Sequence, residues 1–131
     1  MIDTTNKILQ QVFDEIAAAL IKQGKKCVDD NGNCVYQDDD GNHCAIGHLL
    51  VPNSKAMEFG TSLDDMLEDF DEDEIGVNSG FLHENRKMLS LIQCIHDAPH
   101  KAIAIGHAKR LELQHNIDIS AWSEWIEALP R

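Results

Sequence analysis

Five residues whose side chains can bind metals or act as nucleophiles fall between positions 27 and 48: Cys27, Cys34, His43, Cys44 and His48. A structural zinc site needs four thiolate or imidazole ligands and usually presents two of them as a close pair of cysteines. The steps from Cys27 to Cys34 and from Cys34 to Cys44 are seven and ten residues, so no such pair is present. Cys34, Cys44 and His48 are the residues best spaced to share a metal ion. The spacing nevertheless favours chemically quiet, buried cysteines, and we predict no metal or other cofactor.

Cys44 has a second candidate role, as a catalytic nucleophile. It follows the turn at Gly41 and precedes an apolar segment that we expect to be a helix, where free N–H groups and the helix dipole would lower a thiol pKa. His48 or His96 could act as the base, with Asp97 next along the chain. However, His48 lies one turn further along the same apolar segment. We therefore favour a packing role for Cys44, where a hairpin meets this helix.

The pair His96-Asp97 resembles the central pair of the metal-dependent phosphohydrolases of the His-Asp type, which are helical proteins. That family also needs an earlier histidine and a later aspartate. His83 lies too near the pair and His48 rather far from it, and Asp118 fits only by its distance along the chain. Because His96 falls on the apolar face of its helix, we expect a hydrogen-bonded core histidine in preference to a metal ligand.

A calcium site is disfavoured by the same kind of count. An EF-hand loop requires glycine at its sixth position and glutamate at its twelfth. Counted from Asp29, those positions hold Cys34 and Asp40; counted from Asp69, they hold Glu74 and Gly80. Both loops therefore lack the residues that shape the site.

The strongest charge feature is a run of acidic residues between positions 64 and 74. The chain has 23 acidic and 11 basic residues and a formal net charge of −12, which disfavours contact with nucleic acid phosphates. The run could bind a basic surface on another protein, or it could be a solvated helix face. Its eight members are Asp64, Asp65, Glu68, Asp69, Asp71, Glu72, Asp73 and Glu74.

The elements that would position these residues are mostly helical. Apolar residues recur every three or four positions over residues 3–23, with Asp3 or Thr4 as a cap and Gly24 as the end. Asn31-Gly32 predicts a small β-hairpin over residues 26–37. The expected fold class is therefore mainly α with one hairpin (α+β), a single-domain bundle of five or six helices. Further helices are predicted over 44–50, 62–70 (with a cap at Thr61 or Ser62), 81–98, 100–114 and 120–129.

The chain has no run of about 18 apolar residues, so we expect no membrane contact. Residues 1–7 lack the charged start, apolar middle and cleavage site of a secretion signal. We therefore expect a cytoplasmic protein whose thiols stay reduced.

Residues 34–52 and 89–97 resemble a group of small phage and prophage proteins without an established function. Their shared pattern is Cys-x-Tyr, then Gly-x-x-Cys-Ala-Ile-Gly-x-Leu, and later Gln-x-x-His-Asp; it corresponds to Cys34–Tyr36, Gly41–Leu49 and Gln93–Asp97. Gln37 stands where that group has arginine, and the segment after Pro52 lacks an expected tyrosine. The resemblance implies a virus-related origin and action inside a bacterial host.

Together these features favour a small acidic, non-enzymatic binding protein that acts on a host protein with a basic surface. The first alternative is an enzyme that uses Cys44 as its nucleophile, or His96 and Asp97 at a metal or acid–base site. The second alternative is a homo-oligomer that binds a small molecule, and a homodimer is also compatible with the sequence.

Overall fold

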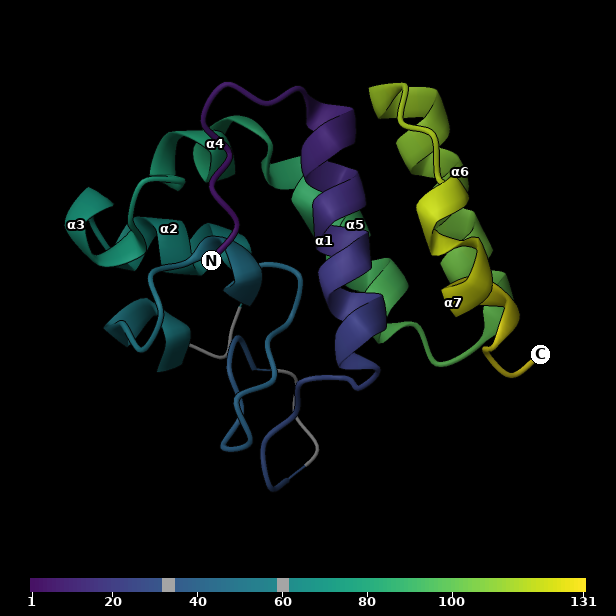
Figure 1. Cartoon of the computed structure of the whole chain (residues 1–131), viewed down its shortest axis with the longest axis horizontal. Coiled ribbons are helices and arrows are strands. Elements are labelled where there is room, and N and C mark those ends of the chain that lie inside the picture. The colour runs from purple at the N-terminus through teal and green to yellow at the C-terminus, as the bar shows by residue number, and fades with distance from the viewer. Residues whose placement is uncertain (32–34, 59–61) are drawn as a thin grey trace.

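The computed structural model describes residues 1–31, 35–58 and 62–131, and these residues are mostly helical (Figure 1). No described helix is long and apolar enough to cross a membrane. Among these residues, three short 3-10 helices accompany the α-helices: η1 (Gly47–Leu49), η2 (Lys55–Glu58) and η3 (Ser120–Trp122). The α-helices of the described residues are α1 (Leu9–Gln23), α2 (Leu63–Asp69), α3 (Glu72–Ile75), α4 (Ser79–Glu84), α5 (Arg86–Asp97), α6 (Lys101–His115) and α7 (Ser123–Glu127).

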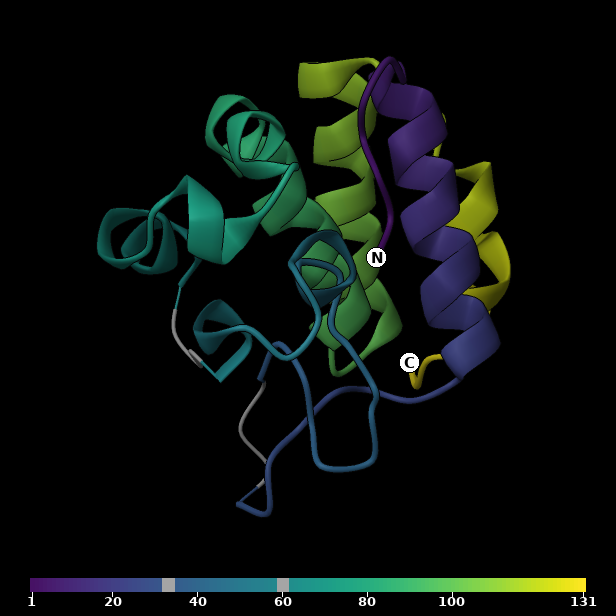
Figure 2. The same ribbon diagram turned by 60° about the vertical axis from the view of Figure 1, so that its left-hand side comes forward.

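The long helices form one side of the molecule. Helices α5 and α6 pack along each other, α7 packs on α6, and η3 contacts α1. Figures 1 and 2 show α2, α3 and α4 on the side away from α6 and α7. The buried hydrophobic residues form one cluster, whose largest fully buried members include Trp122, Phe13, Ile16, Leu20, Leu49 and Leu89.

Helix α1 confirms the first predicted helix but begins at Leu9, not near residue 3. Neither proposed cap serves it: Asp3 accepts a hydrogen bond from the Thr5 N–H, and Thr4 is buried in a contact with Asn78. Asn6 has a φ of 60°, which interrupts a right-handed helix. The predicted end is confirmed, because Gly24 is left-handed with a φ of 72° and its N–H bonds to the Leu20 carbonyl.

The predicted β-hairpin over residues 26–37 is not seen. Its Gly32, Asn33 and Cys34 lie outside the described residues. Within the described part of this segment the Val35 N–H donates to the Cys27 carbonyl at 3.1 Å, and residues 38–42 form a separate turn beside an isolated antiparallel bridge between Gln37 and His43. The Asp38 carboxylate accepts hydrogen bonds from the N–H groups of Asp40 and Asn42, which fixes this turn through a side chain and not through a strand ladder.

Of the other predicted helices, three are broken or shortened and two are confirmed. The predicted 81–98 helix is two helices, α4 and α5, because Asn85 between them leaves the helical region with a φ of −118° and a ψ of 28°. The predicted 44–50 helix is only η1, and the predicted 120–129 helix is η3 followed by α7. The predicted 62–70 helix is α2, where the Ser62 Oγ accepts a hydrogen bond from the Asp65 N–H at 3.3 Å. The predicted 100–114 helix is α6.

Asn78 joins three segments that are distant in sequence. Its side chain is fully buried; Oδ1 accepts hydrogen bonds from the N–H and the hydroxyl of Thr4, at 2.9 and 2.7 Å. Its Nδ2 donates to the carbonyls of Ile2 and Leu49, at 2.6 and 2.9 Å. One amide therefore holds the N-terminal segment against η1 and the start of α4.

Candidate functional site

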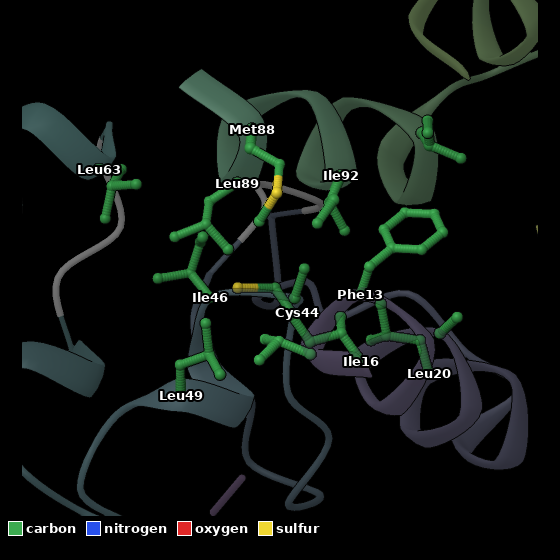
Figure 3. Packing of buried hydrophobic residues seen from close by; sticks show 14 of the residues in the cluster. Phe13, Ile16, Leu20, Cys44, Ile46, Leu49, Leu63, Met88, Leu89 and Ile92 are labelled. Carbon is green, nitrogen blue, oxygen red and sulfur yellow. The ribbon is translucent and has the colours of Figure 1, made fainter. Parts of the chain in front are cut away.

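The structure buries Cys44 in the hydrophobic core. Its side chain lies among Ile46, Leu49 and Leu89 (Figure 3), and only 2 % of the residue is exposed. The Sγ atom accepts a hydrogen bond from the Gly47 N–H at 3.3 Å, but burial outweighs this bond and raises the pKa of the thiol. The expectation of a lowered pKa was therefore wrong, because an apolar environment disfavours the thiolate more than one N–H group favours it.

The segment around Cys44 is built as a tight corner. The Cys44 N–H donates to the Tyr36 carbonyl at 3.2 Å. A Cβ atom added to Gly47 would lie 2.0 Å from that same carbonyl oxygen, so only glycine fits there. This geometry gives Gly47 a structural reason to be glycine, independent of any chemistry at Cys44.

His48 does not form a nucleophile–base pair with Cys44. Among the described residues, no imidazole lies within hydrogen-bonding distance of the Cys44 sulfur, and His48 Nε2 has no partner there. The His48 ring instead lies beside that of His43, with 5.1 Å between centroids. Burial first, and then the neighbouring His43, lowers the pKa of His48 to about 4. With a pKa of about 4, the His48 ring is uncharged at neutral pH.

His96 is a core residue, as predicted, but the predicted hydrogen bond is not found. The residue is 0 % exposed; its ring nitrogens make no hydrogen bond of standard geometry with the described residues, although the Lys25 backbone lies close enough to raise the pKa of the imidazole. Its ring packs against Trp125, with 5.0 Å between centroids, and against Trp122. The Nδ1 atom lies 3.6 Å from the Asp97 carboxylate, and burial lowers the pKa of the imidazole against the effect of that charge.

The described residues do not assemble a metal site. No group of three or more histidine, cysteine, aspartate or glutamate side chains in residues 1–31, 35–58 and 62–131 could hold an ion. Cys34, the third member of the zinc set, lies outside this range. In the phosphohydrolase interpretation, His83 is exposed on α4, and the Asp118 carboxylate accepts hydrogen bonds from the N–H and hydroxyl of Ser120.

The acidic residues do form a shared surface, which we call the acidic surface, on α2 and α3. Seven of the eight are exposed, and Glu74 is half-buried. Asp64 contacts Arg86 at 3.4 Å, and this is the ion pair that the acidic surface makes within the described residues. Several members also serve the fold: Asp64 and Asp65 lie in the first turn of α2, and the Asp71 carboxylate caps α3 by accepting from the Glu74 N–H.

A second feature was missed from the sequence: a groove of about 510 Å³ between α5 and α6, with Asp64 of α2 at its edge. Arg86, Lys87 and Arg110 line it, together with the exposed thiol of Cys94. The available signal was the helical spacing, since Lys87, Leu91 and Cys94 recur at steps of four and three on one helix face. Nothing in that spacing showed that α6 would bring Arg110 opposite to them.

Comparison with known proteins found no matching family model, no matching curated protein and no matching solved structure. The features that bear on function are therefore the acidic surface, the groove, and the burial of Cys44 and His96.

Proposed function

We propose that this chain is a small acidic binding protein without catalytic activity, and that its acidic surface binds a basic surface on another protein. The exposure of seven of the eight acidic side chains carries this proposal. A dense surface of one charge sign attracts an oppositely charged partner over about 8–10 Å at physiological salt and raises the association rate.

The helix dipoles separate the acidic residues that stabilise the fold from those that are better candidates for binding a partner. Negative charge in the first turn of a helix is stabilising by roughly 0.3–1 kcal/mol, so six of the eight acidic residues have a structural explanation: Asp64, Asp65, Asp71, Glu72, Asp73 and Glu74. Glu68 and Asp69 lie at the end of α2, where negative charge is unfavourable to the helix dipole. Their placement there favours a role outside the fold, and we propose that they contribute most to binding.

The alternative of a cysteine or histidine enzyme gains no support from the geometry. Cys44 and His96 are both buried, and neither lines the groove between α5 and α6. A nucleophile or base must reach its substrate in a concave, accessible site.

The resemblance to small phage and prophage proteins suggests the setting of this binding. We propose that the protein acts in the cytoplasm of a bacterial host and that its partner is a host protein. This part of the proposal rests on the sequence motif at residues 34–52 and 89–97 alone.

A charge-reversal experiment tests the proposal. The triple variant Glu68→Lys, Asp69→Lys and Asp73→Lys reverses three of the seven exposed charges and keeps the Asp71 cap of α3. The matched control, Asp39→Lys, Asp40→Lys and Glu112→Lys, changes the net charge equally at exposed positions outside the acidic surface.

Wild-type protein and both variants would capture partners from bacterial lysate at low and high salt, and the affinity of any purified partner would then be measured. We expect a basic partner that the triple variant loses and the control retains, with binding that weakens as salt increases. Equal binding by the two variants would contradict the proposal.

A further inference from the structure

The groove between α5 and α6 reverses the charge balance of the chain. Its lining holds three cationic side chains, Arg86, Lys87 and Arg110, and one acidic side chain, Asp64, which gives a local charge of +2. The whole chain has a net charge of −12. In a concave region such a concentration of one sign focuses the electrostatic potential and attracts a counter-ion.

The two helices present these side chains from opposite walls. Lys87, Leu91 and Cys94 lie on one face of α5, and His107 and Arg110 lie on one face of α6, three residues apart. Helix α5 begins at Arg86 and has no acidic residue in its first turn, so the positive end of its dipole adds to Arg86 and Lys87. Two cations at this end of a 12-residue helix are unfavourable to the fold, and within the described residues Asp64 offsets only Arg86.

We infer that this groove binds a small phosphate monoester, with the phosphate held by Arg86, Lys87 and Arg110 and the organic part over Leu91. A phosphate monoester carries about −1.5 to −2 charges at pH 7, which matches the local charge of +2 better than one carboxylate does. The planar guanidinium groups of two arginines can each donate a pair of hydrogen bonds to phosphate oxygens. A volume of about 510 Å³ is within the range of small-molecule sites.

Asp64 forms an ion pair with one of the three cations, Arg86. Its carboxylate contacts Arg86 at 3.4 Å, and both side chains are more than half exposed, so this pair is weak and exchangeable. A phosphate would compete with Asp64 for the Arg86 guanidinium. Removal of this carboxylate is therefore expected to strengthen phosphate binding.

The test is a titration of the full chain with phenyl phosphate, followed by NMR and by calorimetry. Inorganic phosphate and benzyl alcohol are titrated in parallel, and they separate the contribution of the charge from that of the organic part. Arg110→Gln removes a lining cation; Lys109→Gln is its matched control, because Lys109 is the adjacent exposed cation on α6 and does not line the groove.

We expect saturable binding of phenyl phosphate with shifts at Lys87, Leu91 and Arg110, and weaker binding of both inorganic phosphate and benzyl alcohol. Arg110→Gln should lower the affinity at least about tenfold, because a charge-assisted hydrogen bond is lost. Lys109→Gln should change the affinity less than about twofold, because its charge is screened by solvent. Asp64→Asn should raise the affinity.

Binding should also raise the pKa of His107, which burial first and then Arg110 lower. An NMR titration of this imidazole with and without phenyl phosphate measures the change. An absence of saturable binding, or an equal loss in Arg110→Gln and Lys109→Gln, would overturn the proposal. Tighter binding of inorganic phosphate than of phenyl phosphate would also overturn it, since the organic part would then have no site.

Discussion

Asn78 and His96 are both fully buried polar side chains, but they differ in how many hydrogen bonds their side chains make. Asn78 uses its oxygen and its nitrogen in four hydrogen bonds. The ring nitrogens of His96 make no hydrogen bond of standard geometry with the described residues, and the ring packs against Trp122 and Trp125. Burial alone therefore does not show what a polar residue does: Asn78 joins segments through hydrogen bonds, whereas His96 fills space in the core as a neutral ring.

The difference has an energetic consequence. Deleting one member of a buried hydrogen-bond network leaves its partners without hydrogen bonds, at about 1–3 kcal/mol for each group. Deleting a polar group that has no partner leaves nothing unsatisfied. Substitutions at Asn78 and His96 should therefore give effects of different size, although both residues are equally buried.

The largest expected effect follows from Asn78→Ala. This change leaves the Thr4 hydroxyl and N–H and the carbonyls of Ile2 and Leu49 without their partner, and we expect a loss of about 3–4 kcal/mol in the free energy of unfolding. Urea denaturation measures this loss. Asn85→Ala is the control, since its side chain makes a single hydrogen bond to the Phe81 carbonyl, and it should cost about 1 kcal/mol or less. Equal losses in the two variants would show that the Asn78 hydrogen bonds do not hold these segments together.

The next effect is a dependence of stability on pH. The pKa of His48 is about 4 in the folded protein against an ordinary value of 6.5, and the pKa of His96 is also lowered. Below pH 6.5 the unfolded chain binds protons that the folded chain excludes, so the stability from neutral burial is lost as the pH falls from 6.5 toward 4. For His48 alone we expect the free energy of unfolding to fall by about 1–2 kcal/mol between pH 7.5 and pH 5. His48→Gln should remove this part of the pH dependence. Urea titrations at the two pH values measure the loss; an unchanged pH dependence in His48→Gln would place the titrating group elsewhere.

The features that the sequence could predict depend on residues close together in the chain. Helix α1 and its end at Gly24 follow from the apolar period and a glycine, and the Ser62 cap of α2 follows from residues three positions apart. These are local rules. Asn78 obeys no local rule, because its partner Thr4 lies 74 residues away and only the folded chain brings them together.

The groove was missed for the same reason. Arg86 and Arg110 belong to different helices, and the packing of α5 on α6 creates their proximity. The predicted hairpin is not seen: the described part of residues 26–37 contributes one backbone hydrogen bond, from Val35 to Cys27, and the neighbouring turn at 38–42 is held by side-chain hydrogen bonds of Asp38. The acidic surface was predictable because its eight residues lie close together in the sequence, between positions 64 and 74.

A smaller effect is expected for His96→Leu. Because the ring nitrogens make no hydrogen bonds, an apolar side chain of similar volume should change the free energy of unfolding at pH 8 by about 1 kcal/mol or less. The same variant should be less sensitive to acid than wild type, since one buried imidazole is absent. If His96→Leu lowers the free energy of unfolding at pH 8 as much as Asn78→Ala does, the ring nitrogens of His96 make hydrogen bonds that stabilise the fold.

The smallest effect tests burial without any change in sequence. Burial raises the pKa of both thiols, but Cys44 is buried in the core, whereas Cys94 is exposed. Since the thiolate is the reactive form, brief treatment of the native protein with iodoacetamide at pH 8 should alkylate Cys94 well before Cys44. Peptide mass spectrometry locates the label, and the same treatment in urea should label both residues as the positive control. Rapid native labelling of Cys44 would mean that the corner around Gly47 opens, and the buried thiol would again be a candidate nucleophile. Protection of Cys44 until the chain unfolds would place it with His96, among the polar side chains that the core holds in their neutral form.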